Sequence, residues 1–144
     1  MIRAATTADH TAIRGLLLDA NLPVEDLDGS DIAFLVAATP AGIVGAIGLQ
    51  ACGTAGLLRS LVVLPAQRGD GIGVALVHAL EQRAQRQGIH QLVLLTQTAE
   101  QFFARLGYAP VARGDVPMAL QTTAEFSALC PASATCMRKL LSQT

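Results

Sequence analysis

Apolar residues recur along this chain with two different periods. Continuous or alternating apolar runs predict strands over residues 2–5, 32–38, 43–51, 55–64, 92–96, 108–112 and 135–141. Apolar positions at helical spacing predict helices over 8–20, 74–87 and 99–106, and a shorter one over 123–129. Two of the strands lead directly into helices, so the pattern predicts an α/β or α+β domain with a mixed sheet.

Turn-forming residues mark the boundaries of these elements. Thr7 is a suitable N-cap for the first helix, and Gly88 and Gly107 stand where left-handed C-terminal caps are expected. Residues 39–42 read Thr-Pro-Ala-Gly between two apolar runs, which predicts a hairpin. Residues 21–30 are polar and acidic, and we interpret them as a loop of the kind that carries binding residues.

Composition narrows the class of protein. The chain has 144 residues, of which 51% are hydrophobic and 15% charged, so we expect one folded domain over residues 1–144. A net charge of −1 without blocks of like charge argues against a protein held on nucleic acid by its charge. No apolar run reaches ~18 residues and the first residues lack a signal-peptide pattern, so we expect a cytoplasmic protein without a membrane span.

Neither the cysteines nor the histidines form a metal-binding pattern. An odd number of cysteines without a CxxC pair favours reduced, buried thiols at Cys52, Cys130 and Cys136. The three histidines are isolated from one another in the sequence, and we expect all of them at the surface. We therefore predict no metal site.

The most informative segment is a glycine-rich turn between a strand and a helix. It reads Arg68-Gly69-Asp70-Gly71-Ile72-Gly73. Alternate glycines let the backbone approach a ligand closely, and the unpartnered amides and dipole of a helix N-terminus favour an anion. Arg68 adds a forked cationic donor beside them. The turn therefore predicts a phosphate site, against the alternative of a glycine-rich connection without a ligand.

The turn matches neither of two common phosphate-binding motifs, because it lacks the residues that carry their chemistry. A P-loop needs Gly-Lys-Ser/Thr, whereas residues 71–74 read Gly-Ile-Gly-Val. A dinucleotide site needs G-x-G-x-x-G and an acidic residue about 20 positions later. The spacing here is G-x-G-x-G, and residues 92–95 read Leu-Val-Leu-Leu.

The turn instead matches the R/Q-x-x-G-x-G/A pyrophosphate motif of GNAT acetyltransferases, and residues 62–65 resemble the strand end that precedes it. Residues 99–108 look like the A-x-x-F-Y-x-x-x-G-F/Y helix of the same family. Through residues 58–63, 95–103 and 124–134 the chain also resembles a subgroup associated with arsenic-resistance operons, which is similar to amino-acid N-acetyltransferases. The resemblance implies a single α/β (α+β) GNAT domain whose mixed, mostly antiparallel sheet has six to seven strands flanked by helices.

The resemblance also implies a cofactor site and a reaction. The acetyl-CoA arm would lie along Leu61, Val62 and Val63, and the pyrophosphate would be held by Arg68, Gly69, Asp70, Gly71, Ile72 and Gly73. The implied enzyme moves an acetyl group from acetyl-CoA to the amine of a small, amino-acid-like acceptor by direct attack in a ternary complex. An acetyl-cysteine route through Cys52 or Cys130 has no support in the spacing. A non-catalytic acyl-CoA-binding or sensory domain is the rival interpretation.

Catalytic residues are less well defined. Many GNAT enzymes have a proton-donating Tyr at the position of Phe103, and Phe103 cannot donate a proton. Tyr108 is a weak candidate for this role, although a Tyr at its position more often packs the core. Glu25 and Asp26, on the loop after the first helix, could supply the general base or could be solvated loop acids.

Substrate-binding candidates lie on two strands. Arg59 interrupts an apolar strand, where it could bind an acceptor carboxylate by a bidentate fork, form a structural salt bridge or reach solvent. Strand alternation predicts that Ser60 points to the opposite face from Arg59. By resemblance, Thr96 and Thr98 offer hydroxyls near a split in the sheet. The expected partner is a small-molecule amine, with no nucleic acid or membrane partner, and a homodimer stays open.

Overall fold

The computed structural model describes residues 1–27, 31–129 and 132–141. In this part of the chain the strands are β1 (Ile2–Ala4), β2 (Ala33–Thr39), β3 (Gly42–Cys52), β4 (Ala55–Val63), β5 (Gln91–Thr96), β6 (Ala109–Pro110) and β7 (Thr135–Leu140). The α-helices are α1 (His10–Asp19), α2 (Ile72–Arg86), α3 (Glu100–Arg105) and α4 (Met118–Gln121). Short 3-10 turns cover Thr7–Asp9, Pro65–Gln67 and Arg113–Asp115, and a π-helical turn covers Glu125–Leu129.

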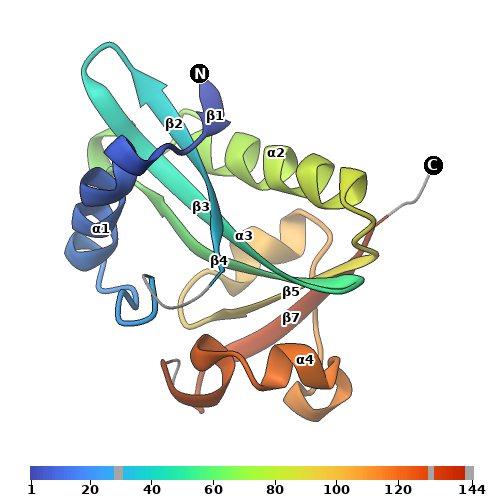
Figure 1. Ribbon diagram of the computed structural model, residues 1–144. Coiled ribbons are helices and arrows are strands. Elements are labelled where there is room, and N and C mark those ends of the chain that lie inside the picture. Colours follow the sequence, from blue (N-terminus) through green and yellow to red (C-terminus); the bar gives the residue numbers. More distant parts are fainter. Residues whose placement is uncertain (28–30, 130–131, 142–144) are drawn as a thin grey trace.

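The strands form one mixed sheet in the order β1-β2-β3-β4-β5-β7-β6 (Figure 1). Within the described residues β4 and β5 are parallel and the other neighbours are antiparallel. The predicted fold class, a mixed and mostly antiparallel sheet with flanking helices, is therefore confirmed.

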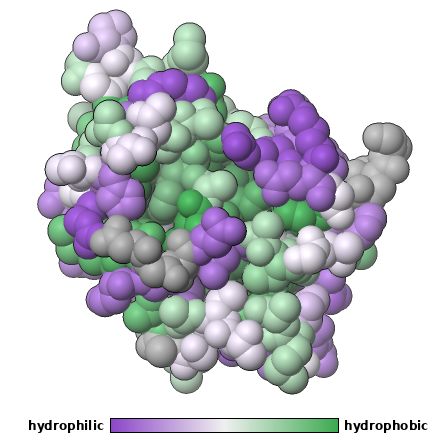
Figure 2. All heavy atoms as spheres, in the orientation of Figure 1, coloured by the Kyte–Doolittle hydropathy of each residue, from purple (hydrophilic) through white to green (hydrophobic). Residues whose placement is uncertain are grey.

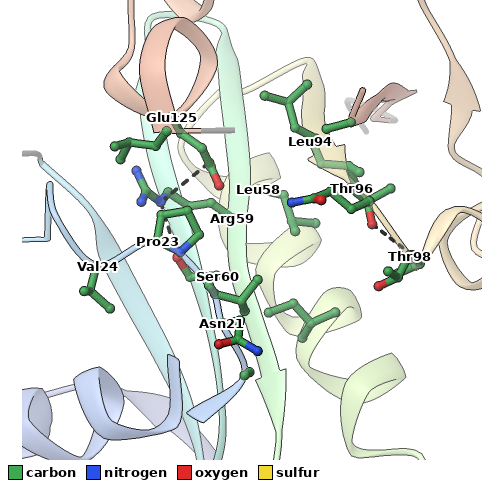
Figure 3. A pocket seen from close by; sticks show the side chains of 18 of the residues that line it. Asn21, Pro23, Val24, Leu58, Arg59, Ser60, Leu94, Thr96, Thr98 and Glu125 are labelled. Carbon is green, nitrogen blue, oxygen red and sulfur yellow. Dashed lines mark hydrogen bonds and ion pairs between the residues drawn. The ribbon is translucent and has the colours of Figure 1, made fainter. Parts of the chain in front are cut away.

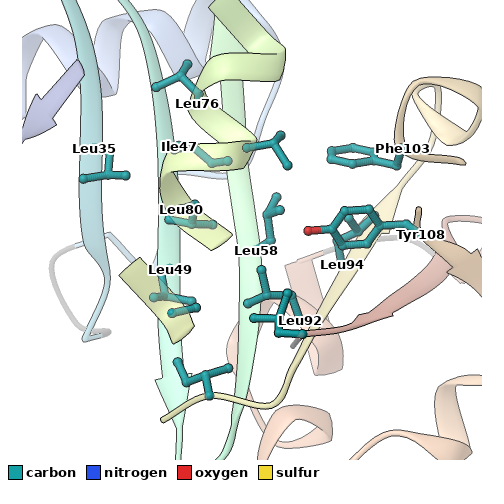
Figure 4. Close-up of a cluster of buried hydrophobic side chains, with 14 of the residues drawn as sticks. Leu35, Ile47, Leu49, Leu58, Leu76, Leu80, Leu92, Leu94, Phe103 and Tyr108 are labelled. Atoms are coloured by element: carbon teal, nitrogen blue, oxygen red, sulfur yellow. The ribbon is translucent and has the colours of Figure 1, made fainter. Parts of the chain in front are cut away.

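Helices cover both faces of the sheet, because consecutive apolar residues of a strand point to opposite faces. One face packs under α2 and α3, where Leu76 and Leu80 of α2 lie over Ile47 and Leu58 (Figure 4). The opposite face carries Val36, Ala46 and Val62 against α1. Near the other edge, Leu57, Val93 and Cys136 pack with Leu120 of α4 and Phe126. The predicted helix over 74–87 is thus the central cover of the sheet, and it begins two residues earlier.

The parallel strands β4 and β5 pair over a short distance and then separate. Their registered partners run from Ala55–Gln91 to Leu57–Val93. Beyond these pairs, β4 continues beside β3 as far as Val63, and β5 continues beside β7 as far as Thr96. We call the opening between the two strands the wedge.

A β-bulge interrupts β4 where it pairs with β3. Ala46 pairs with Val62 but Gly48 pairs with Arg59, so β4 has one extra residue here. Ser60 takes up the distortion with a φ of 60°. The expectation that Ser60 points away from Arg59 is wrong, because the bulge breaks the two-residue alternation. Nε of Arg59 donates to Oγ of Ser60 at 3.3 Å, and both residues line the same cavity.

Several predicted boundaries shift. The strand expected over 108–112 is reduced to two residues, and α4 was not predicted. The N-cap predicted at Thr7 is Asp9 for α1 and Thr6 for the 3-10 turn before it, where Asp9 accepts hydrogen bonds from the backbone N–H and hydroxyl of Thr6. Gly88 and Gly107 have φ angles of 80° and 98°, as expected for left-handed caps. Cys130 lies outside the described residues.

Two kinds of feature are absent from the part of the chain that the structure describes. No helix found there is both long and apolar enough to cross a membrane. Among these described residues, there is also no group of three or more His, Cys, Asp or Glu side chains that could hold a metal ion.

Candidate functional site

A cavity of about 700 Å³ occupies the wedge. Its walls are residues 58–61 of β4, residues 94–99 at the end of β5, and the loop 20–25 after α1, with Phe103 and Glu125 closing it. The space-filling view shows a recessed apolar area at the middle of this face, surrounded by hydrophilic residues (Figure 2). The cavity therefore lies between the two separating strands and the loop that was expected to carry binding residues.

The glycine-rich turn stands where β4 ends and α2 begins. Gly71 is the N-cap of α2 with a φ of 79°, and Gly69 has a φ of 93°. No atom lies within 4 Å of where a Cβ would stand at either glycine, so this backbone faces open space. Nε of Arg68 donates to the carbonyl of Val63 at 3.2 Å, which ties the cation to the end of β4. Exposed amides at a helix N-terminus beside a fixed guanidinium fit a pyrophosphate group.

Arg59 lies at the inner end of the cavity and is almost fully buried, with 2% of its surface exposed. Its Nη1 and Nη2 donate to Oδ2 and Oδ1 of Asp26 at 2.6 and 2.7 Å. Nη1 also lies 3.4 Å from Oε1 of Gln50. In this structure the fork that was expected to bind an acceptor carboxylate therefore binds a carboxylate of the protein itself. Substrate binding by Arg59 stays a prediction, and it requires exchange with Asp26.

Glu125 brings a second carboxylate to Arg59. It is 5% exposed, lines the cavity from the turn before β7, and places Oε2 3.7 Å from Nε of Arg59. Figure 3 shows it pointing toward Arg59 across the cavity from Leu94 and Thr96. The buried group of Asp26, Arg59 and Glu125 thus has one cation between two carboxylates.

The remaining candidates have different surroundings. Glu25 lines the cavity but is exposed, and its Oε2 accepts from the N–H of Val24 at 3.1 Å. Thr96 also lines the cavity, and its hydroxyl accepts from the N–H of Ala99 at 3.0 Å. Both residues stay predictions as members of the site.

Tyr108 belongs to the main core and is absent from the described cavity lining. Its hydroxyl donates to Oε2 of Glu81 at 2.8 Å, and Nζ of Lys139 lies 3.1 Å from the same oxygen. Burial, together with the charge of Glu81, raises the pKa of Tyr108 far above its ordinary value. These contacts fit a packing role for Tyr108 better than proton donation.

Four of the predicted cofactor residues line two neighbouring hollows. Leu61 lines the 700 Å³ cavity, whereas Val62, Val63 and Arg68 line a smaller cavity of about 180 Å³ beside the end of α1. Sequence reasoning assigned no role to Glu125 and did not pair Asp26 with Arg59. The one signal in the sequence was the resemblance of residues 124–134 to family members, which carried no information about contacts.

The parting strands, the glycine turn and the cavity together resemble the site of an acyltransferase that uses a CoA thioester, and the comparison with known families identifies the class. Residues 30–110 match the model of the acetyltransferase (GNAT) domain, which covers more than half of the chain. The chain therefore belongs to the GNAT acetyltransferase family. Acetyl-CoA fits as its cosubstrate, and CoA is bound in three of the similar structures.

Solved structures of GNAT proteins resemble the chain over nearly its whole length. N-acetylglutamate synthase from Neisseria gonorrhoeae, complexed with CoA and N-acetyl-glutamate, is 18% identical with a TM-score of 0.84 over 99% of this chain and 35% of that chain. Rv2747 from Mycobacterium tuberculosis, in complex with CoA and a further ligand, is 25% identical with a TM-score of 0.77 over 99% of both chains. A GNAT acetyltransferase from Staphylococcus aureus is 20% identical with a TM-score of 0.78 over 99% and 100% of the two chains.

The chain spans about a third of the Neisseria gonorrhoeae synthase, 35% in one complex and 33% in another. The structures below 25% identity show a shared fold. No curated protein matches the sequence significantly.

Proposed function

We propose that this chain is an N-acetyltransferase that moves the acetyl group of acetyl-CoA to the amine of a small, amino-acid-like acceptor. The GNAT domain would span residues 1–144, and the amine would attack the thioester directly in a ternary complex. The observation that carries the proposal is the wedge, because its cavity lies beside both residues 58–61 of β4 and the loop after α1. A thioester and an amine could meet there without a covalent enzyme intermediate.

The cofactor would be held at two places. Backbone groups of Leu61, Val62 and Val63 would bind the pantetheine arm, and N–H groups of this strand would stabilise the oxyanion formed during attack. Arg68, the amides of residues 69–73 and the dipole of α2 would hold the pyrophosphate. Asp70 and Ile72 contribute through their backbone in this scheme. Acetyl-CoA supplies the activated acyl group.

The amino-acid-like acceptor follows from the charges in the cavity. An α-amino acid carries a carboxylate next to an ammonium, and the cavity carries a guanidinium next to a carboxylate at Arg59 and Glu125. Arg59 would bind the acceptor carboxylate in exchange for Asp26. The resemblance to the arsenic-resistance subgroup extends this proposal to amino-acid-like toxins. A cytoplasmic location and a homodimer remain proposals of the same kind.

A non-catalytic acyl-CoA-binding or sensory domain is the second candidate. It is favoured by Phe103, which lines the cavity where many family members have a proton-donating Tyr. Catalysis without that Tyr is chemically acceptable, because a thiolate is a stable leaving group near neutral pH. The two candidates agree on cofactor binding and differ on turnover.

The test is chromatographic detection of CoA and acetylated product from acetyl-CoA with amino acids, polyamines and amino-acid-like toxins. Chromatography avoids thiol dyes, which would also react with the protein's cysteines. Turnover of an α-amino acid or a close analogue would support the enzyme. If no acceptor is acetylated although acetyl-CoA binds tightly to the wild type and weakly to Gly71→Glu, the sensory function would replace it.

A further inference from the structure

We infer that Glu125 is the catalytic residue that binds the ammonium group of the acceptor and accepts its proton. This inference rests on the proposed function and deepens it, because it names the group that makes the amine nucleophilic. The position of Glu125 carries the argument. Its carboxylate lies at the cavity wall, is 5% exposed, and comes from the turn before β7, opposite the end of β5 (Figure 3).

The arrangement around Arg59 shows that neutralising this cation does not require Glu125. Asp26 already accepts from both terminal nitrogens at 2.6 and 2.7 Å, the geometry of a complete bidentate pair. Glu125 lies on the remaining side, 3.7 Å from Nε, a distance that suits charge attraction better than a hydrogen bond. A carboxylate that lies beside an existing ion pair and at a cavity wall is well placed to bind a ligand.

Charge balance points to a cationic ligand. Two buried carboxylates share one guanidinium, and buried charges are costly unless they are compensated. The ammonium of an acceptor would bring a second positive charge to this group.

Glu25 is the competing acid on the cavity wall. It is exposed to solvent and bonded to the N–H of its own neighbour, Val24, at 3.1 Å. A solvated carboxylate gains little from an ammonium, because water screens the interaction, whereas a buried one interacts strongly. Glu125 is therefore the better placed of the two for binding and proton transfer.

The reaction balances with Glu125 in this role. The ammonium gives one proton to the Glu125 carboxylate, directly or through one water, and becomes a neutral amine. The nitrogen lone pair then forms a C–N bond with the thioester carbonyl carbon, and the C–S bond breaks. The nitrogen loses its second proton, the departing thiolate gains one, and the proton on Glu125 passes to solvent. The net products are the amide, CoA thiol and one proton.

The experiment compares Glu125→Gln with Glu25→Gln in the full-length chain, using the acceptor that the chromatographic panel identifies. The Gln variant keeps the shape of the side chain and removes its charge and basicity. For E125Q we expect kcat/KM at pH 7 to fall by about 100-fold or more, with CoA affinity unchanged within about twofold. The loss should shrink as pH rises, because the acceptor then loses its proton to solvent. E25Q should lose far less activity than E125Q, because the Glu25 carboxylate is exposed to solvent.

Each outcome decides the inference. A loss that is the same at every pH, or that is accompanied by weakened CoA binding, would indicate a structural role and overturn it, as would full activity of E125Q. If E125Q does not fold, Glu125→Asp replaces it: kcat/KM at least about tenfold below the wild type, with CoA affinity within about twofold and a loss that shrinks as pH rises, supports the inference. Unaltered kcat/KM, or a loss that is the same at every pH, overturns it. Absence of wild-type turnover would overturn the proposed function and this inference together. If the wild type is active and E125Q is equally active, only the role assigned to Glu125 is overturned.

Discussion

Asp26 and Arg59 form a bidentate ion pair, with Nη1–Oδ2 and Nη2–Oδ1 distances of 2.6 and 2.7 Å. Their side chains are 9% and 0% exposed, and 33 residues separate them in the sequence. The pair joins the loop after α1 to the bulge of β4. It therefore holds the loop that would surround the acceptor against the strand that would bind the acetyl-CoA arm.

Replacing Asp26 by Ala should destabilise the fold strongly. Breaking a buried ion pair costs about 3–5 kcal/mol in the free energy of unfolding where the remaining charge is uncompensated, and Glu125, 3.7 Å from Nε of Arg59, keeps the cost here near the lower end of that range. We expect D26A to lose about 3 kcal/mol in urea denaturation, and E25A, at the adjacent exposed carboxylate, to change by less than about 0.5 kcal/mol. Equal stabilities of D26A and E25A would show that Asp26 is not the main partner of Arg59.

Arg59→Lys should separate carboxylate-bearing acceptors from simple amines. Lysine preserves a positive charge beside Asp26 and Glu125 but cannot offer the planar, bidentate fork. We expect KM to rise about tenfold for an amino acid and to stay within about twofold for the matching amine without a carboxylate. Steady-state kinetics by chromatography measure both values. An equal rise for the two acceptors would mean that Arg59 acts only as a structural residue.

The ion pair between Arg3 and Asp9 should make the stability of the fold sensitive to acid. Hydrogen bonds from Arg3, and then from the N–H of Thr6, hold the pKa of Asp9 well below its usual range. A depressed carboxyl pKa contributes stability above the ordinary value, and this contribution is lost as pH falls through the lowered value.

The difference in Tm between the wild type and Asp9→Asn should therefore be constant near pH 6 and shrink below about pH 4. Thermal unfolding by circular dichroism at a series of pH values tests this expectation. Asp115→Asn, at an exposed carboxylate, should show no comparable dependence. A constant D9N difference down to pH 2 would contradict the assigned cause.

Much of the fold could be predicted from local pattern. Apolar runs and helical spacing located β2 to β5, α1 and α2 within a few residues, because the strands are buried in continuous runs and the helices bury one face each. The helix α4 was missed because it has only four residues, too few for a period to appear. The register of β4 against β5, which creates the wedge, depends on pairing between distant segments and leaves no local pattern.

The site was less predictable for the same physical reason. Gly71 and Arg68 lie within one continuous motif, so their proximity was implied by the sequence. Asp26, Arg59 and Glu125 come from three distant segments that only the folded sheet brings together. Ser60 shows a further limit, because its bulge reversed the orientation that strand alternation predicted.

Gly71 and Gly88 provide a matched test of the cofactor turn. They stand at the two ends of α2, have φ angles of 79° and 80°, and have no atom within 4 Å of the position that a Cβ would take. Alanine in the left-handed region costs about 1–2 kcal/mol, so both G71A and G88A should lose similar stability. At Gly71 the strain also displaces amides that would bind the pyrophosphate. We expect the Kd for CoA, measured by titration calorimetry, to rise about tenfold or more in G71A and to stay within about twofold in G88A. Equal affinities in the two variants would place the pyrophosphate elsewhere.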